Sequence, residues 1–587
     1  MKQFFKFMFA SMLGFILAGV VLIFIFIAII SAAISSKGER TVAIADNSVL
    51  EIRLENPVKE RTSKNPFEDL NFDLSQKHDL GLNDILKNIE KAKTDDHVKG
   101  IFLNLSSVNA GMAQLEEIRN ALIQFKTSKK FIYAYSEGYD QANYYLASVA
   151  DSVFLNPEGS FDWHGFRTEL MFMKGALEKL EIEPEVIRHG KFKSAVEPFI
   201  NEKMSPENRA QIAQLIHGIW NYYVQQVAES RNADAAVFQN AAYEMSVRTP
   251  EKAVELRLVD KLAYTDEVQS ALKKASGISE KDKVKFIALR KYNKAPGASK
   301  LFSGKKIAII YAVGEIGGGD GDENSIGSDK LSAAIRKARL DTSIKAIVLR
   351  VNSPGGSALA SEVIWREMLL AKKAKPVIVS MSDLAASGGY YIACAADTIV
   401  CEPNTITGSI GVFGLLFNAQ KLLNNKLGLT FDTVKTGRFA GIGTPTRPLT
   451  SEERDIVQEE VERIYDTFIT HVANGRNISK AEVDSLGQGR VWSGIDAKRL
   501  GLVDVLGGIN TAIEIAAKKA NLDNYRTISL PEGEDVLKKL IEDFSDDVSA
   551  GVTGKNFGTA YDYYAQVHSL LKQQGVMARM PFDINVR

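Results

Sequence analysis

Hydrophobic residues along the chain form one long uncharged run followed by many short clusters. Residues 7–34 contain no charged side chain, and a helix of that length can cross the hydrocarbon core of a bilayer, which is about 30 Å thick. Because the apolar region of a cleaved signal peptide has only about 7–15 residues, the run predicts an uncleaved transmembrane anchor. Lys2 and Lys6 precede the run, so the positive-inside rule places the N-terminus in the cytoplasm and the remaining chain outside it.

After this run, short clusters rich in β-branched residues alternate with longer segments whose apolar residues recur at helical spacing. The predicted strands, buried on both faces, are residues 307–311, 346–351 and 377–381. The predicted helices are residues 331–339, 358–371 and 451–473. Thr450 and Glu453 provide an N-cap for the last helix. The alternation predicts an α/β fold with a largely parallel sheet.

The chain after the anchor contains two copies of one unit. The sequence Y-Y-L-A-S-V-A-D begins at Tyr144, and the related Y-Y-I-A-C-A-A-D begins at Tyr390. Three further matches keep nearly the same offset, which a chance resemblance would not do. They begin at Gly100 and Ala346, at Arg231 and Arg476, and at Leu258 and Leu502. We therefore predict a tandem duplication of one α/β unit.

The duplication divides the chain into four parts. They are the cytoplasmic N-terminus and anchor (1–40), the first copy (41–290), the second copy (291–530) and a tail (531–587). A basic segment containing Pro296 and Gly297, residues 285–300, is expected to join the two copies. The tail has no counterpart in the first copy, and its role stays open.

Composition narrows the possible classes of function. Hydrophobic residues make up 45% and charged residues 25% of the chain, which is typical of a folded protein. The 72 basic and 72 acidic side chains cancel, and without a local basic patch we predict no nucleic-acid partner. The seven histidines include no pair at metal-ligand spacing, so we predict no metal and no cofactor. Cys394 and Cys401 are expected to be small buried side chains.

Two glycine-rich turns follow predicted strands in the second copy and are missing from the first. Residues 352–357 read N-S-P-G-G-S, and residues 385–390 read A-A-S-G-G-Y. Because turns needed only for folding would be expected in both copies, the difference predicts a site used once per chain. Glycines let backbone N–H groups approach a ligand, so we predict Ser387 as a nucleophile with an oxyanion hole formed by Gly356 and Gly388. In the alternative reading, the paired glycines only allow the following tyrosine to pack closely.

The reverse difference concerns a lysine. The first copy reads G-K-F-K-S-A-V-E-P-F from Gly190, and the second reads G-R-F-A-G-I from Gly437. Aligned through the shared glycine and phenylalanine, Lys193 corresponds to Ala440. A serine hydroxyl becomes a good nucleophile when a base takes its proton, and an amine can be that base when burial lowers its pKa. We therefore predict that Lys193 is buried between the copies and acts as the general base for Ser387.

Other residues near these segments have competing interpretations. Lys191 competes for the role of base, although its alignment with an arginine favours a surface position. His189 could also be the base, but no aspartate is tied to it by any pattern. Ser353 is expected to be a turn former rather than a second nucleophile. Tyr390 and Tyr391 are expected to be core residues, because the pair recurs in the first copy.

Four segments resemble those of the signal peptide peptidase A (protease IV) family in its long bacterial form. They are N-S-P-G-G-S from Asn352, S-D-L-A-A-S-G-G-Y-Y from Ser382, T-G-S-I-G-V-F-G from Thr407 and K-S-A-V-E-P-F from Lys193. The resemblance extends from the anchor to about residue 525. It implies a Clp-protease/crotonase-like fold and a homotetrameric serine endopeptidase with a dyad of Ser387 and Lys193.

The resemblance also implies a location and a substrate class. The protein would be anchored in the bacterial inner membrane through residues 7–34, with its catalytic domains in the periplasm. Its substrates would be remnant signal peptides and other apolar peptides. Two alternatives stay open. A crotonase-like acyl-CoA enzyme predicts a buried carboxylate near the glycine-rich turns, and a non-catalytic membrane scaffold would use the duplication for assembly alone.

Overall fold

The computed structural model describes residues 42–62, 80–296, 304–322, 324–531 and 575–580, together with separate residues between 3 and 18. The predicted anchor, residues 7–34, lies mostly outside these described residues. Within the described part of the chain, no helix is both long enough and apolar enough to cross a membrane.

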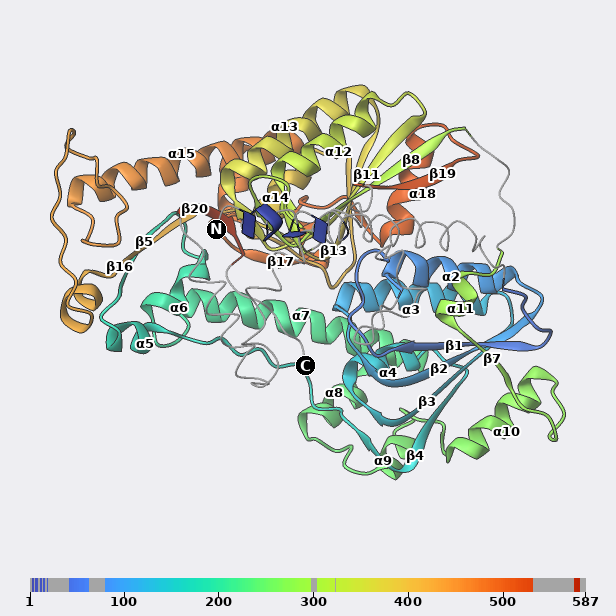
Figure 1. Ribbon diagram of the computed structural model, residues 1–587. Coiled ribbons are helices and arrows are strands. Elements are labelled where there is room, and N and C mark those ends of the chain that lie inside the picture. Colours follow the sequence, from blue (N-terminus) through green and yellow to red (C-terminus); the bar gives the residue numbers. More distant parts are fainter. Residues whose placement is uncertain are drawn as a thin grey trace.

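The first copy is built on a six-stranded parallel sheet. Its strands, in order across the sheet, are β6 (Lys261–Leu262), β4 (Ser152–Phe161), β3 (Phe131–Tyr139), β2 (Val98–Val108), β1 (Ser48–Leu54) and β7 (Lys285–Ala288). Its helices are α2 (Leu82–Thr94), α3 (Met112–Lys126), α4 (Gln141–Ala147), α8 (Ala235–Tyr243), α9 (Pro250–Glu255), α10 (Thr265–Ser276) and α11 (Leu289–Asn293). Helices α2 and α3 cover one face of the sheet, and α10 covers the other (Figure 1).

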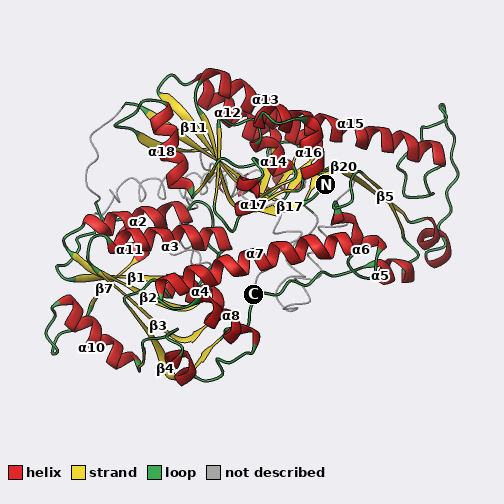
Figure 2. Cartoon of the chain, turned by 180° about the vertical axis from the view of Figure 1, so that it is seen from behind, coloured by secondary structure: helices red, strands yellow, loops and turns green. Residues whose placement is uncertain are grey.

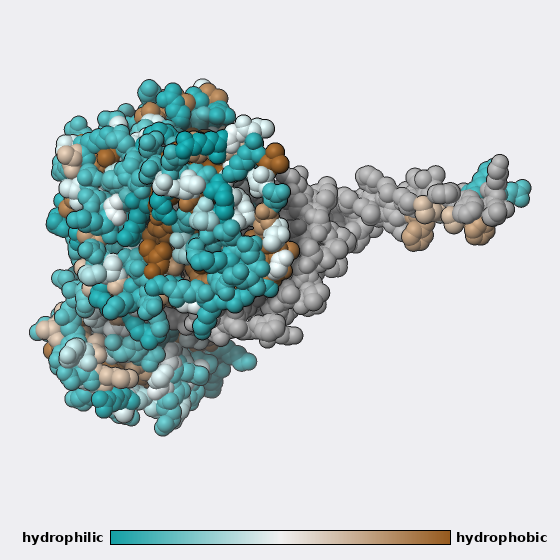
Figure 3. All heavy atoms as spheres, turned by 90° about the vertical axis from the view of Figure 1, so that its left-hand side faces the viewer, coloured by the Kyte–Doolittle hydropathy of each residue, from teal (hydrophilic) through white to brown (hydrophobic). Residues whose placement is uncertain are grey.

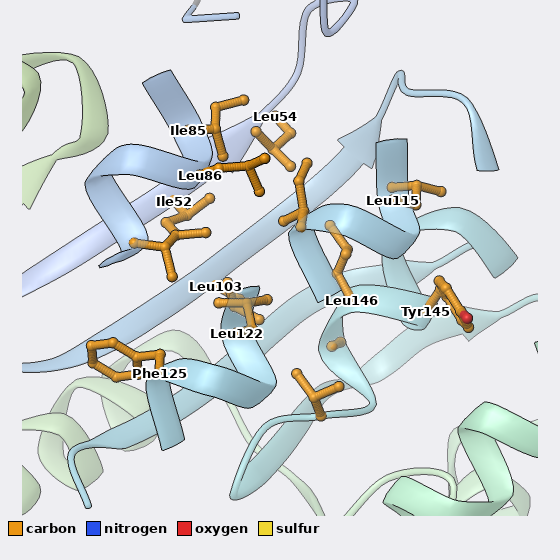
Figure 4. Close-up of a cluster of buried hydrophobic side chains, with 14 of the residues drawn as sticks. Ile52, Leu54, Ile85, Leu86, Leu103, Leu115, Leu122, Phe125, Tyr145 and Leu146 are labelled. Carbon is orange, nitrogen blue, oxygen red and sulfur yellow. The ribbon is translucent and has the colours of Figure 1, made fainter. Parts of the chain in front are cut away.

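The core of this copy follows from the alternation of side chains along each strand. Ile101 and Leu103 of β2 pack in the cluster under α2 and α3, whereas Phe102 between them packs against α10. Figure 4 shows the first cluster, in which leucine and isoleucine side chains from the strands meet those of the two helices. A strand that is apolar on both faces therefore marks a sheet covered on both faces.

The second copy has its own sheet, which is parallel apart from one edge strand. Its order is β17 (Val491–Ser493), β15 (Ile406–Gly408), β13 (Val377–Ala386), β11 (Ile344–Ser353), β8 (Lys306–Val313) and β19 (Arg526–Leu530). Strand β14 (Thr398–Cys401) pairs with β13 and with β18 (Val505–Leu506), and β17 runs antiparallel to β15. The three predicted strands are confirmed as the central strands β8, β11 and β13.

The helices of the second copy confirm the predicted pattern. They are α12 (Ser328–Leu340), α13 (Ala358–Ala374), α14 (Gly388–Ala393), α15 (Ser451–Arg476), α16 (Lys480–Leu486), α17 (Gly494–Arg499) and α18 (Ile509–Lys519). The N-cap of α15 is the predicted one. The Thr450 hydroxyl accepts from the Glu453 backbone N–H at 3.2 Å, and the Glu453 carboxylate accepts from the Thr450 N–H at 3.0 Å. The described chain is therefore an α/β protein with two parallel-sheet units.

Equivalent hydrogen bonds in the two copies explain why the repeated segments match. The tyrosine hydroxyls donate to carbonyl oxygens of the L-V-D segments, from Tyr144 to Leu258 at 2.6 Å and from Tyr390 to Leu502 at 2.8 Å. The repeated arginines pair with the aspartates of the same segments, Arg231 with Asp260 and Arg476 with Asp504. The matches thus mark contacts that hold each unit together.

The predicted junction at residues 285–300 is wrong for its first half. Residues 285–288 form β7, which pairs in parallel with β1, and residues 289–293 form α11. The side chains of Ile287, Leu289 and Tyr292 are buried, so this basic segment completes the first unit rather than linking it to the second. The boundaries of the four predicted parts remain predictions.

A third sheet joins the two copies and the tail. Its order is β10 (Ser325–Gly327), β9 (Glu315–Gly317), β12 (Gly355–Ser357), β20 (Gly575–Arg579), β16 (Phe413–Asn418) and β5 (Glu183–Arg188). Strand β5 of the first copy runs antiparallel to β16 of the second. Helices α5 (Lys174–Lys179), α6 (Glu197–Ile200) and α7 (Pro206–Ser230) belong to the first copy, and α7 extends from the region of the third sheet back to the first (Figure 2).

A buried ion cluster also crosses between the copies. Arg350 on β11 donates to Glu60 at 2.7 Å and to Glu117 at 2.5 Å. The arginine side chain is fully buried, and both carboxylates are almost fully buried. Both glutamates belong to the first copy, so the cluster fixes its position against the strand that leads into the N-S-P-G-G-S turn.

Replacing Arg350 by methionine is expected to destabilise the protein by about 3–5 kcal/mol, because two carboxylates would remain buried without their cation. Chemical unfolding at neutral pH measures the loss. Arg463→Met is the matched control, since Arg463 pairs with Glu460 on the exposed side of α15, and a surface pair contributes at most about 1 kcal/mol. Equal stability of the two variants would contradict a structural role for the cluster.

Candidate active site

Ser387 lies at the turn between β13 and α14, in the A-A-S-G-G-Y segment. Its backbone has φ 56° and ψ −115°, a conformation that a residue with a side chain adopts only at a strain of about 1–3 kcal/mol. Its N–H donates to the Gly408 carbonyl at 2.8 Å, and its side chain is fully buried. A strained strand-to-helix turn of this kind fixes the direction of the serine hydroxyl.

Lys193 follows β5, immediately before the short 3-10 turn Ser194–Val196. Its Nζ atom lies 2.8 Å from the Ser387 Oγ atom, and its side chain is fully buried. The structure therefore brings together the serine of one copy and the lysine of the other, as the complementary differences between the copies predict.

Burial lowers the pKa of Lys193 well below its usual value. A buried ammonium without an acidic partner is unfavourable, which favours the neutral amine. The Nζ atom also lies 3.1 Å from Oγ and 3.3 Å from the carbonyl oxygen of Ser409. A neutral amine has two N–H donors and one lone pair. If both donors bind Ser409, the lone pair can accept the proton of the Ser387 hydroxyl, which otherwise lies 3.5 Å from the Gly411 carbonyl oxygen.

Ser409 is a site residue that the sequence reasoning missed. It lies in the T-G-S-I-G-V-F-G segment, and its backbone has a positive φ of 49°. Its N–H donates to the Arg490 carbonyl at 2.7 Å, which fixes its position beside the lysine. In the sequence, Ser409 could have been singled out only because its segment is one of the four that resemble the signal peptide peptidase A family.

The two glycine-rich turns touch each other next to Ser387. A Cβ atom added to Gly355 would lie 2.6 Å from the Gly388 backbone nitrogen, so no side chain fits there. Gly356 lies against Ile316 of β9, whose carbonyl oxygen would be 2.1 Å from an added Cβ atom, and its role in an oxyanion hole stays a prediction. Both glycines have positive φ angles, 99° for Gly355 and 152° for Gly356. The geometry thus explains why this turn requires two consecutive glycines.

The competing candidates lie in other environments. Lys191 is exposed. The His189 ring contacts the Glu462 carboxylate at 2.7 Å, so it is engaged on the surface of α15. The Ser353 hydroxyl accepts from the Gly355 N–H at 3.2 Å, which is the bond of a turn former.

The remaining candidates are core residues. Tyr390 and Tyr391 are buried, and the Tyr391 hydroxyl donates to the Glu362 carboxylate at 2.5 Å. Cys394 and Cys401 are also buried. Burial raises the pKa of the Cys394 thiol to about 12, so this thiol is neutral and unreactive at physiological pH. These residues behave as the sequence predicts.

Comparison with known proteins places the chain in a class. The model of peptidase family S49 matches residues 124–279 and 370–523, one stretch in each copy. The chain belongs to this family of serine peptidases.

Individual relatives agree with this assignment. Protease 4 of Salmonella typhi is 38% identical over 477 residues, which cover 80% of this chain and 76% of that protein. Protease 4 of Haemophilus influenzae is 36% identical over 524 residues, 87% of this chain and 83% of that protein. The chloroplastic serine protease SPPA of Arabidopsis thaliana is 34% identical over 515 residues, 85% of this chain and 74% of that protein. The family resemblance predicted from the four segments is thereby confirmed.

The prediction of a Clp-protease/crotonase-like fold has no comparable support from solved structures. A ClpP1 chain from Listeria monocytogenes aligns with 35% of this chain and 94% of its own length, at 16% identity and a TM-score of 0.23. That similarity is too low to carry an argument, so the Clp-protease/crotonase-like assignment stays a prediction.

Proposed function

We propose that this serine peptidase is a membrane-anchored endopeptidase whose catalytic dyad consists of Ser387 and Lys193. The observation that carries the proposal is the 2.8 Å contact between Lys193 Nζ and Ser387 Oγ. Both side chains are fully buried, and burial lowers the pKa of the lysine, which favours its neutral form. Holding a lysine in this state is unfavourable for folding, which supports a functional reason for its presence.

The geometry supports an acyl-transfer mechanism. The neutral Lys193 amine takes the proton of the Ser387 hydroxyl while Oγ attacks the carbonyl carbon of the substrate peptide bond. Backbone N–H groups of the two glycine-rich turns, with Gly388 directly after the serine, stabilise the negative charge on the carbonyl oxygen. The resulting ammonium then donates its proton to the departing amine. Water, deprotonated by the same lysine, releases the acyl group from Ser387 and restores the dyad.

Ser409 has a positioning role in this mechanism. Its hydroxyl and carbonyl oxygens lie at 3.1 and 3.3 Å from the lysine Nζ atom. They hold the amine so that its lone pair points at the nucleophile, and they accept its N–H groups when it becomes an ammonium.

The proposed substrates are remnant signal peptides and other apolar peptides at the bacterial inner membrane. The long uncharged run supports an anchor in the lipid bilayer through residues 7–34, with the catalytic domains in the periplasm. Apolar clusters beside the dyad support an apolar substrate. One contains Val196, Phe199 and Phe413, and another contains Ile212, Leu215 and Ala386.

A homotetramer is also proposed. Figure 3 shows the end of the molecule that bears the β16–α15 connection. This face is mostly polar and includes an apolar area. Large apolar side chains are exposed on that connection, at Leu427, Leu429, Phe431, Val434, Phe439 and Ile442. An exposed apolar surface of this kind supports a contact between subunits.

The substrate proposal is tested with the full chain in lipid vesicles. A synthetic signal peptide inserted in the same vesicles is expected to be cut within its apolar core, as read by mass spectrometry of the fragments. A polar peptide of equal length is the control and should be cut at least about tenfold more slowly, because each buried CH₂ contributes roughly 0.8 kcal/mol to binding. Equal cleavage of both peptides would contradict the proposed substrate class.

The acyl-CoA alternative predicts a buried carboxylate near the turns, and Glu60 occupies such a position. Its carboxylate accepts from the Asn352 side chain at 3.0 Å. Burial alone would raise the pKa of Glu60, but Arg350 and hydrogen bonds from neighbouring side chains bring it below its usual value. A carboxylate held as a counter-ion is poorly suited to be a general base, so Glu60 does not support the acyl-CoA alternative.

A further inference from the structure

Helix α3 of the first copy begins without a capping side chain of its own. Its N-cap is Gly111, which has no side chain to accept from the free N–H groups of the first turn. The equivalent helix of the second copy, α13, has Ser357 as its N-cap, and the serine hydroxyl accepts from the Ala360 N–H at 3.3 Å. Gly111 and Ser357 correspond in the register set by the repeated segments. The two copies therefore differ at the start of one helix, as they do at the two residues of the dyad.

The second copy supplies the missing cap through Asp383. The Oδ1 atom of Asp383 accepts from the backbone N–H groups of Ala113 at 2.8 Å and of Gln114 at 3.2 Å. These are the second and third residues of α3, the positions to which an N-cap side chain normally bonds. The three atoms nearest to a Cβ atom added to Gly111 all belong to the Asp383 carboxylate, at 2.1–2.3 Å. Glycine thus leaves the room that the carboxylate of the other copy occupies.

The surroundings of Asp383 suit an ionised carboxylate. The N-terminus of a helix carries partial positive charge. The Asn352 side-chain amide, at the start of the first glycine-rich turn, also donates to the Oδ2 atom of Asp383 at 3.4 Å. Burial and the negative charge of Glu60 raise the pKa of Asp383 to about 6, which leaves the carboxyl group mostly ionised at neutral pH. Asp383 therefore contacts the first copy and the glycine-rich turn at the same time.

The capped helix is bonded to α7, the long helix of the first copy. The Arg119 guanidinium on α3 donates to the Gln226 carbonyl of α7 at 2.7 Å. In the other direction, the Tyr222 hydroxyl of α7 donates to the Glu116 carboxylate of α3 at 2.9 Å. Both contacts lie in the C-terminal half of α7, so a displacement of α3 would be transmitted to this helix.

The opposite end of α7 holds the loop that carries the lysine (Figure 2). The side-chain amide of Gln211 donates to the Phe192 carbonyl at 3.1 Å and to the Ser194 hydroxyl at 3.0 Å. These two residues stand on either side of Lys193. Contacts thus run without a break from Asp383 through α3 and α7 to the lysine, while Asp383 itself lies on β13, the strand that ends at Ser387.

We propose that Asp383 is a positioning residue for the dyad. By capping α3 across the two copies, it holds the first copy against the strand of the nucleophile and so sets the distance between Lys193 and Ser387. This inference rests on the proposed dyad, whose two members belong to different copies. A serine N-cap such as Ser357 stabilises its helix equally well, but it cannot join one copy to the other.

Replacing Asp383 by alanine tests the proposal in the full chain. We expect kcat for a fluorogenic apolar peptide to fall by about 10- to 100-fold, because a displacement of about 1 Å at a reacting group has an effect of this size. KM should stay nearly unchanged, since the apolar clusters beside the dyad are intact, and labelling of Ser387 by a peptidyl phosphonate should slow by the same factor as kcat. Asp383→Asn keeps an oxygen that accepts from α3 and should keep most of the activity.

A double variant separates positioning from simple stabilisation of the helix. In Asp383→Ala/Gly111→Ser, removal of the carboxylate leaves room for a serine that caps α3 from within its own copy. We expect this protein to regain the resistance to urea that Asp383→Ala loses, while kcat and labelling stay low. It also provides the measurement if the single variant folds poorly. Asp234→Ala is the matched control, because Asp234 caps α8 within the first copy by accepting from the Ala236 N–H at 2.8 Å, and its loss should leave kcat unchanged.

The outcomes decide the proposal in either direction. Recovery of activity together with stability in the double variant would reduce Asp383 to a helix cap and overturn the positioning role. Unchanged kcat and labelling in Asp383→Ala, or equal losses in the alanine and asparagine variants, would overturn it as well. Failure of the dyad itself would be distinguishable, because Ser387 would then resist labelling in the unaltered chain.

Discussion

A Ser387→Ala protein is expected to lose cleavage of a fluorogenic apolar peptide by a factor of at least about 10⁴, as removal of a nucleophile does in serine peptidases of other folds. The strained turn directs a single hydroxyl at Lys193, and alanine leaves no atom that can form the acyl bond. Substrate binding should persist, because the glycine-rich turns and the apolar clusters beside the dyad are unchanged.

Steady-state kinetics of purified protein in detergent measures this loss. Ser485→Ala is the matched control, since that serine is exposed on α16, and it should behave as the unaltered chain. A Ser387→Ala protein that retained more than a few per cent of the activity would mean that another residue supplies the nucleophile.

Removal of the general base is expected to have the second largest effect. Lys193→Ala should lower kcat by at least about 10³, within the range that general-base and nucleophile activation supply together. Lys191→Ala is the matched control, because it removes a lysine two positions away whose side chain is exposed. Full activity without Lys193, or equal losses in the two variants, would refute its assignment.

The pH dependence follows from the same lysine. Burial lowers its pKa, and only the neutral amine can accept the serine proton. The rate should therefore rise with pH through this lowered pKa and level off well below the pH range in which an ordinary lysine loses its proton. A rate that continued to rise towards pH 10 would indicate a lysine with an ordinary pKa.

The sequence predicted the dyad because duplication supplies an internal comparison. The serine turn kept in the second copy and Lys193 kept in the first are each missing from the other copy, so the two losses point to one shared site. The structure places these two side chains in contact. By contrast, pairs such as Arg231 with Asp260 occur in both copies. These repeated pairs hold each unit together.

Other features could not be predicted from the comparison of the two copies, and each has a physical reason. Arg350 contacts Glu60 and Glu117, residues far away in the sequence, and no periodicity encodes such a contact. Strand β20 is a short segment of a tail without a counterpart, and its pairing is decided by the edges of β12 and β16. The error at residues 285–293 arose because basic residues on an edge strand and a surface helix concealed three buried apolar side chains.

Labelling with a serine-reactive peptidyl phosphonate, followed by mass spectrometry of the digested protein, tests the central claim most directly. The dyad predicts one modified residue, Ser387, in the unaltered full chain, and at least a hundredfold slower labelling in Lys193→Ala, because an unactivated hydroxyl is a poor nucleophile. Modification of Ser353 or Ser409 in place of Ser387, or labelling of Ser387 at the same rate without Lys193, would contradict it.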